Sequence, residues 1–443
     1  MSVLGLDIGT SATKGVLLDD RGRVLAQARR GYRTRAPMAG RAELSAPRVW
    51  LAVRDVLRTL AAEGERAGSP VRAVCAGGSG DEVVALDARG HPVAPVIMAA
   101  DDRSAAEGAA IADVCGGTDL FVRTGLWDLA ATPAVRWHWM GRHEPMRAAR
   151  VVRLLSWPEW VMTRLGLPPV TDPTLAARTL AFDVQAGAYA SLGCPPMALP
   201  DGLLSPVVPT GSDVGGIPAG SARGAGLRPG TRYVVGGFDQ AMATLGAGAI
   251  EPGIAHDGNG SWEALSLRVR RATIDPRLGS GGWSVGPAAS GPSLEVMGSW
   301  RGGLALGRRS ARSSASLDAL AERLASALRE LLALGLPVTR IRATGGGAAS
   351  ERWLQLKADA TGVPVERTVV RQAGALAAAM LAGGAIGALP SIDEAARMLV
   401  AIDLRCEPRP GRSGGPGRVG TGPVSTGRTA APGGHRPRAR RCR

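Results

Sequence analysis

The chain has 443 residues and a formal net charge of +15, with 45% hydrophobic and only 4% aromatic residues. This length exceeds what one compact core holds, so at least two domains are expected. Ten arginines and a single acid, Glu407, fall in residues 404–443. The remaining body is therefore only weakly basic, which disfavours nucleic acid as its partner.

The five cysteines are widely spaced and form no CxxC or Cys/His cluster, so neither a disulfide framework nor a zinc site is predicted. The N-terminus shows no basic and apolar leader segment. The longest uncharged run, residues 373–390, is rich in Ala and Gly, and it predicts a buried helix rather than a membrane span. We expect a soluble, cytoplasmic protein without a membrane partner.

Residues 3–27 have the alternation of a β-meander, with a turn at "DRG". An amphipathic helix is predicted over 47–62, because its valines and leucines fall on one face. Strands at 71–76 and 83–87 flank the polar glycine turn "GGSGDE". The first half of the chain is therefore α/β in pattern.

A similar pattern begins near residue 231, where "RYVVGGFDQAMATLGAG" indicates a strand, a Gly-Gly turn and a small-residue helix. "IAHDGNGSWEALSLRV" then indicates two strands around a glycine turn. A helix over 316–334 is predicted with Ser316 as its cap, followed by the strand and turn "VTRIRATGGGAAS". The Pro/Gly-rich segment 205–230 is the expected boundary between two related halves.

Glycine turns follow apolar strands four times, at 9–13, 77–80, 258–261 and 345–347. Glycine lets backbone amides approach an anion closely, so a set of such turns indicates a nucleotide cleft, although each turn alone is also compatible with a plain tight turn. The chain has no GxxxxGK[ST], and no GxGxxG follows a strand, which excludes P-loop and Rossmann sites.

The order of these motifs resembles the FGGY carbohydrate kinase family over roughly residues 3–404. The matching segments are "GLDIGTSATKG", "GRAELSAPRVW", "GGSGDEVVALDARGHPVAPVIMAADDR", "VTDPTLAARTLAFD", "GGFDQAMATLGAGAIEPG", "ATGGGAASERWLQLKADATGVPV" and "GALAAAMLAGGAIG". The resemblance implies two actin-like, ribonuclease H-like α/β domains with a cleft between them, at 1–228 and 229–404. It also implies ATP with Mg²⁺ as cofactors and a small sugar or polyol as substrate, with a homodimer possible.

The resemblance assigns Asp239, in "GGFDQ", as the base that accepts the substrate hydroxyl proton. A plain helix N-cap is the alternative for this residue, and both roles are compatible. Asp7 matches the acid that holds Mg²⁺, usually through water. Further residues are expected to contact the nucleotide: Gly9, Thr10, Ser11, Lys14, Gly258, Asn259, Gly260, Ser261, Gly345, Gly346 and Gly347.

Asp81 and Glu82 stand where the family places substrate-facing residues, and Asp102 with Arg103 loosely matches a further acid–arginine cluster. The family's preceding tryptophan is absent there, so Arg103 also fits a surface ion pair. One sequence does not rank the sugars or polyols that such a pocket would accept.

Two departures from the family pattern stand out. The helix at 317 follows "MGSWRGGLALGRR" almost at once, so a stretch of the second domain is expected to be missing. After "CEPRPGR" the chain becomes an Arg/Gly/Pro-rich segment, which predicts a disordered tail over 405–443 and suggests a change of reading frame near residue 410. A catalytically impaired nucleotide- or sugar-binding homologue, or nucleic-acid binding through the tail, are the competing functions.

Overall fold

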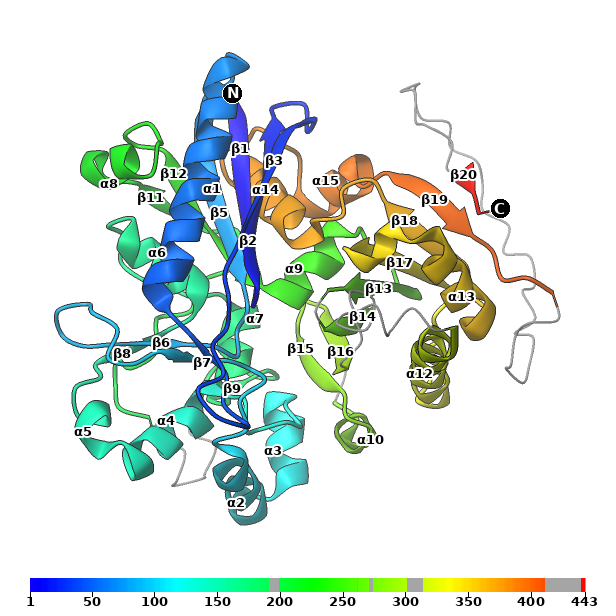
Figure 1. Ribbon diagram of the computed structural model, residues 1–443, viewed down its shortest axis with the longest axis horizontal. Coiled ribbons are helices and arrows are strands. Elements are labelled where there is room, and N and C mark those ends of the chain that lie inside the picture. The colour runs from blue at the N-terminus through cyan, green and yellow to red at the C-terminus, as the bar shows by residue number, and fades with distance from the viewer. Residues whose placement is uncertain (191–198, 261, 271–273, 301–313, 411–439, 443) are drawn as a thin grey trace.

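The computed structural model describes residues 1–190, 199–260, 262–270, 274–300, 314–410 and 440–442. Two β-sheets form the framework of the chain, one in each half (Figure 1). The first has the strand order β11-β12-β5-β1-β2-β3 and the second the order β15-β16-β14-β13-β17-β18-β19-β20. The predicted α/β class is confirmed.

The first sheet is built on a meander of β1 (Ser2–Ile8), β2 (Ala12–Asp19) and β3 (Val24–Gly31). β5 (Val71–Gly78) runs parallel to β1, β12 (Arg232–Phe238) runs parallel to β5, and β11 (Asp213–Gly216) closes the edge. α1 (Ala46–Arg66) covers one face with the apolar stripe that the sequence predicts. Every residue of β1 is buried, as expected for a central strand with neighbours on both sides.

The second sheet repeats this arrangement. β13 (Ile254–Asn259), β14 (Glu263–Val269) and β16 (Leu294–Trp300) are antiparallel, while β17 (Arg340–Gly345) and β18 (Val365–Thr368) continue in parallel from β13. β15 (Ser284–Pro287) pairs with β16. α12 (Ser314–Ala333) and α13 (Glu351–Thr361) are the crossover helices, and α12 begins before the predicted cap at Ser316. Three antiparallel strands followed by two parallel ones in each sheet match the expected pair of ribonuclease H-like domains. Since β12 belongs to the first sheet, the first domain extends beyond the boundary expected at residue 228.

Two helices of small residues lie between the sheets: α9 (Asp239–Gly246) and α14 (Ala373–Ala385) (Figure 1). α14 passes so close to β1 that a Cβ added at Gly5 would lie 2.0 Å from the carbonyl oxygen of Ala375. Residues 373–383 are all buried, so the Ala/Gly run is the predicted interior helix. Among the described residues, none of the helices combines the length and apolar character that a membrane span needs.

The remaining elements surround these sheets. In the first half they are β4 (Glu43–Leu44), β6 (Val84–Leu86), β7 (Val96–Ile97), α2 (Ala105–Cys115), α3 (Gly117–Thr124), α4 (Pro133–His143), α5 (Pro145–Ala148), β8 (Arg153–Leu155), α6 (Trp157–Arg164), α7 (Pro173–Ala176), η1 (Ala177–Thr179), β9 (Phe182–Asp183), β10 (Ala188–Tyr189) and α8 (Ala219–Gly224). In the second half they are α10 (Pro276–Ser280), η4 (Gly347–Ala349) and α15 (Ile392–Leu399).

The C-terminal segment departs from the sequence prediction in its described parts. β19 (Ile402–Cys406) is antiparallel to β18, and β20 (Arg440–Arg441) pairs with β19. A disulfide joins Cys406 and Cys442, although the wide cysteine spacing did not predict one. Residues 405 and 406 therefore belong to the second sheet rather than to a disordered tail, because β18 supplies their hydrogen-bond partners. Most of the predicted tail, 411–439, lies outside the described residues.

Candidate functional site

A cleft of about 320 Å³ contains residues from both halves of the chain. It brings together most of the predicted site residues, namely Asp7, Gly9, Thr10, Ser11, Lys14, Asp81, Asp239, Gly258, Asn259, Gly260 and Gly345. Five predicted residues do not line it: Glu82, Asp102, Arg103, Gly346 and Gly347. Ser261 lies outside the described residues.

Asp7 and Lys14 face each other across the first hairpin. They are directly paired in the antiparallel register of β1 and β2, and Lys14 Nζ donates to Asp7 Oδ2 at 2.9 Å. The charge of Asp7 raises the pKa of the Lys14 ammonium group. The turn between them is held by a hydrogen bond from Gly9 N–H to Ala12 O at 3.2 Å. One carboxylate and one cation are therefore fixed at the edge of the cleft by sheet register alone.

Asp239 is the first residue of α9, directly after β12, and Phe238 occupies the N-cap position. Two hydrogen bonds hold the backbone that precedes Asp239. Phe238 N–H donates to Thr174 Oγ1 at 2.7 Å, and Thr174 Oγ1 donates to the buried Asp172 at 2.8 Å. A Cβ at Gly237 would lie 2.5 Å from Thr174 Oγ1, so this position requires glycine. The end of β12 thus places the Asp239 carboxylate in the lining of the cleft.

The carboxylate of Asp239 has an unusual protonation equilibrium. Burial, followed by the negative charges of Asp7, Glu82 and Asp81, raises its pKa to about 8, while Lys14 acts in the opposite direction. A carboxylate with a pKa near the working pH is suited to take up a proton in a reaction.

The turn of the second hairpin lines the cleft with Gly258, Asn259 and Gly260. Asn259 is 3% exposed, and its side chain points inward. Its Oδ1 accepts hydrogen bonds from Trp353 Nε1 at 2.8 Å and from Lys357 Nζ at 2.7 Å. Gly345, with φ of 80°, lies so close that an added Cβ would be 2.7 Å from Asn259 O. This side of the cleft is therefore a glycine-lined backbone surface, which suits an anion.

The N-terminus of α14 completes this surface and was not predicted from the sequence. An added Cβ at Gly374 would lie 3.3 Å from Asp7 Cγ, so the helix begins beside the first hairpin. The cleft is lined here by Arg371, Gln372, Ala373 and Gly374. Helix N-termini carry partial positive charge and free N–H groups, which attract phosphate. The signal in the sequence was the polar pair before the Ala/Gly run.

The opposite end of the cleft contains residues that the sequence did not indicate. Arg178 binds Asp81 Oδ1 through Nε at 2.9 Å and Nη2 at 2.7 Å, and its guanidinium lies over the Phe238 ring. Trp127 and Asp128 also line this end. Arg178 and Asp81 are 97 residues apart, so no local pattern could have paired them.

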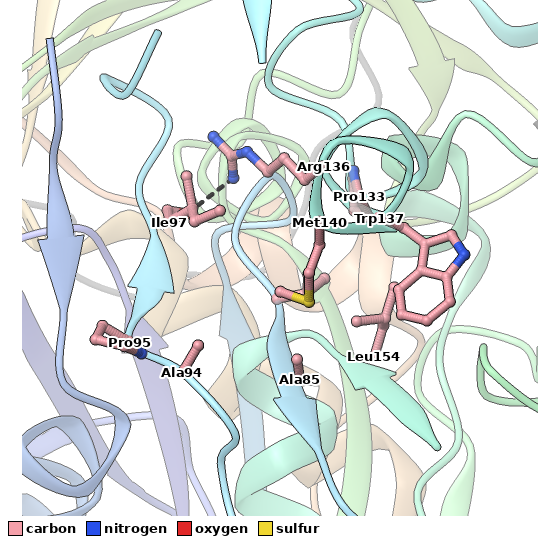
Figure 2. A pocket seen from close by; sticks show the side chains of 10 residues that line it. Ala85, Ala94, Pro95, Ile97, Pro133, Arg136, Trp137, Met140 and Leu154 are labelled. Carbon is pink, nitrogen blue, oxygen red and sulfur yellow. Dashed lines mark hydrogen bonds between the residues drawn. The ribbon is translucent and has the colours of Figure 1, made fainter. Parts of the chain in front are cut away.

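The loop of Asp81 is held in place by Arg136, which extends from α4 toward β7 (Figure 2). This buried guanidinium donates to Asp81 O at 2.6 Å, Ile97 O at 2.8 Å and Met98 O at 2.8 Å. The apolar cavity beside it in Figure 2 has a volume of about 20 Å³, which is room for a water molecule but not for a sugar.

Three predicted substrate residues have other contacts. Glu82 is fully buried and accepts hydrogen bonds from Ser79 Oγ and from Ala99 N–H, the latter at 3.1 Å. Arg103 forms ion pairs with Asp101 at 2.7 Å and Glu43 at 2.8 Å, which leaves Asp102 outside the pair. Arg103 and Glu82 therefore support the fold behind the cleft.

The sequence matches the model of the FGGY family of carbohydrate kinases, N-terminal domain, over residues 2–246, and the C-terminal domain of that family over residues 309–386. It is 26% identical to a glycerol kinase of Bordetella parapertussis, covering 88% of this chain and 90% of that protein. It is 31% identical to a xylulose kinase of Streptomyces coelicolor over 62% of this chain and 56% of that protein.

The fold is similar to the crystal structure of a gluconate kinase from Lactobacillus acidophilus, with a TM-score of 0.83 and 19% sequence identity. That match covers 92% of this chain and 94% of the other. More than half of the chain falls within the N-terminal family model alone, and the two repeated sheets agree with it. The chain therefore belongs to the FGGY family of carbohydrate kinases.

Proposed function

We propose that this chain transfers the γ-phosphoryl group of ATP to a hydroxyl group of a small sugar or polyol, with Asp239 as the general base. The observation that carries the proposal is the meeting of Asp239, the Asp7–Lys14 pair and the backbone of the second hairpin in one cleft. Phosphoryl transfer needs a base that takes the proton of the acceptor hydroxyl, and it needs a surface that binds the phosphates of ATP.

Asp239 accepts the proton of the acceptor hydroxyl while that oxygen forms a bond to the γ-phosphorus, and the bond to the ADP oxygen breaks. Its raised pKa makes the carboxylate a stronger base than an ordinary aspartate. Lys14 and the N–H groups at the start of α14 face the negative charge that develops on the phosphoryl oxygens.

The donor set of the cleft is compatible with Mg²⁺ bound beside ATP. Among the described residues, no group of three or more His, Cys, Asp or Glu side chains is arranged to hold a metal. Mg²⁺ keeps several waters and needs only one or two carboxylates together with phosphate oxygens, which Asp7 satisfies from the edge of the cleft. When bound, the ion would neutralise charge on the phosphates.

An impaired binding protein is the alternative, because a segment before α12 is shorter than the family pattern. The described residues nevertheless contain all five strands of the repeated sheet in the second half, with the crossover helices α12 and α13. This complete framework around the second hairpin supports turnover.

The test is release of ADP, measured with a coupled assay over pentuloses, hexuloses and polyols in the presence and absence of Mg²⁺. We expect ADP release that depends on both a sugar or polyol and Mg²⁺. The variant Asp239→Ala should abolish it while leaving ATP binding intact by calorimetry. Full turnover by this variant would show that Asp239 is not the base, and binding of ATP without turnover by the unmodified protein would favour the alternative.

A further inference from the structure

The acceptor end of the cleft is rich in carboxyl groups. Three carboxyl groups line it, those of Asp81, Asp128 and Asp239, and a fourth, that of Glu82, is buried next to Asp81 in the chain. Their proximity has a physical effect on each other: after burial, the charge of Asp81 is the next cause that raises the pKa of both Glu82 and Asp128.

The cations near this end are already engaged. Nε and Nη2 of Arg178 both donate to the same carboxylate oxygen of Asp81, and the face of the guanidinium lies over Phe238, 5.0 Å from the ring centroid. Lys14 is paired with Asp7 at 2.9 Å. Arg136 is 3% exposed and directs its donors to three backbone carbonyl groups, so it does not reach the cleft.

Asp128 is the carboxylate most available to a ligand. It is exposed, and Ala130 N–H donates to its Oδ1 at 3.2 Å. No ion pair involves it in the described part of the chain. Trp127, beside it, is 49% exposed and reaches toward the second half, where a Cβ added at Gly282 would lie 3.9 Å from the indole ring. The acceptor end therefore offers hydrogen-bond acceptors and one aromatic surface.

On the basis of the proposed kinase function, we infer that the acceptor is an uncharged, hydroxyl-rich compound, a polyol or ketose, and that Asp128 and the Asp81–Arg178 pair exclude sugar acids. Hydroxyl groups donate to carboxylates, and Arg178 offers its remaining N–H groups to hydroxyl oxygens. A carboxylate on the ligand would need a free cation, and it would instead meet Asp81 and Asp128. Placing like charges together without compensation is unfavourable, especially where water is displaced.

The experiment compares binding by calorimetry of polyols and ketoses of three to seven carbons with the aldonates of the same chain length. The protein is the full chain, measured at about 20 mM and again at about 500 mM salt, because screening weakens exposed charge–charge repulsion. We expect the best uncharged compound to bind at least about tenfold more tightly than its matched aldonate at low salt.

Two variants locate the origin of this preference. Asp128→Asn should reduce the preference several-fold, chiefly by improving aldonate binding, and high salt should reduce it in the same direction. Asp113→Asn, an exposed aspartate on α2 outside the cleft, is the matched control and should leave the preference unchanged.

The possible outcomes separate this inference from the proposed function. The inference would be overturned if aldonates bind as tightly as the uncharged compounds of the same chain length. It would also be overturned if the affinity ratio between them changes neither in Asp128→Asn nor at high salt. Failure of every uncharged compound to bind would overturn it as well. Selective binding of a polyol or ketose without ADP release in the presence of ATP and Mg²⁺ would instead leave the inference standing and overturn only the kinase activity.

Discussion

Lys357 and Asp257 form an ion pair beneath the second hairpin, and neither side chain reaches solvent. The same ammonium group lies 2.6 Å from Glu263 Oε1. The first hairpin holds Asp7 against Lys14, so the two lysines of this otherwise arginine-rich chain each pair with an aspartate on the first strand of a meander. The first pair opens on the cleft, whereas the second is enclosed behind it. We therefore expect Lys357 to act by holding the nucleotide-facing turn in place.

Replacing Lys357 with methionine should be strongly destabilising. The substitution leaves Asp257 and Glu263 buried without a cation, and removal of one partner of a buried pair costs about 3–5 kcal/mol. Because Lys357 also donates to Asn259 Oδ1, Lys357→Met should raise the KM for ATP in the fraction that stays folded.

Thermal unfolding and ATP-dependent initial rates measure these two effects. Arg329→Met is the control, because Arg329 pairs with Glu322 at 2.6 Å on an exposed helix surface, where an ion pair contributes about 0–1 kcal/mol. Equal melting temperatures for the Lys357 and Arg329 variants would show that the buried cluster does not stabilise the turn.

Asp239→Asn should separate catalysis from folding. Asparagine fills nearly the same volume but cannot accept a proton, and loss of a general base typically lowers kcat by about 10²–10⁴-fold. Calorimetric binding of ATP should stay within a few-fold, because the phosphate surface is formed by the hairpins and α14 rather than by Asp239. A variant that loses ATP binding and turnover together would indicate that Asp239 supports the cleft structurally instead.

Local sequence patterns predicted the parts of the site that lie on a single hairpin or at the end of a single strand. Asp7 and Lys14 are seven residues apart and meet through strand register, and Asp239 follows its strand directly. The repeated meanders could be predicted for the same reason, since alternation and glycine turns are local signals.

The acceptor end could not be predicted, because its contacts depend on tertiary structure. Arg178 could have met any of the acids of the first half, and in the fold it pairs with Asp81 while its guanidinium lies over Phe238 of β12. Arg103 likewise has Asp101, Asp102 and Glu43 as candidate partners. Its guanidinium pairs with Asp101 and Glu43 and not with Asp102. Asn259 was expected to contact the nucleotide, but its side chain turns inward to Trp353 and Lys357.

The pH dependence should reveal the protonation of Asp239. Burial and the charge of Asp7 raise its pKa from 3.8 to about 8, and only the carboxylate form accepts a proton. With ATP well below its KM, kcat/KM for the acceptor should therefore rise with pH, with a midpoint near pH 8, and level off above it. Lys14 lowers this pKa, so Lys14→Met should shift the rise to higher pH in addition to weakening ATP binding. A profile that levels off by pH 5 would contradict the assignment.

The same equilibrium affects stability, with a sign opposite to that of a salt-bridged aspartate. Between pH 3.8 and about 8 the native state holds a proton that the unfolded state has lost, so the contribution of Asp239 to the free energy of unfolding falls as pH rises through this range. Asp239→Asn removes that penalty, and its melting temperature relative to the unmodified protein should increase between pH 6 and pH 9. A difference that is constant with pH would show that Asp239 titrates normally.

Gly237→Ala should impair catalysis by displacing the backbone that positions Asp239. The added methyl group would lie 2.5 Å from Thr174 Oγ1 and 2.9 Å from Asp172 Oδ2, so the chain before Asp239 must move or the Thr174–Asp172 hydrogen bonds must break. Overpacking of this kind costs about 1–3 kcal/mol, and a displaced base costs about 10²-fold in kcat. Gly220→Ala on α8 is the matched control, because nothing lies within 4 Å of its added Cβ. Steady-state kinetics and thermal unfolding of both variants provide the measurement. If both variants keep full kcat, the Thr174–Asp172 hydrogen bonds do not position the base.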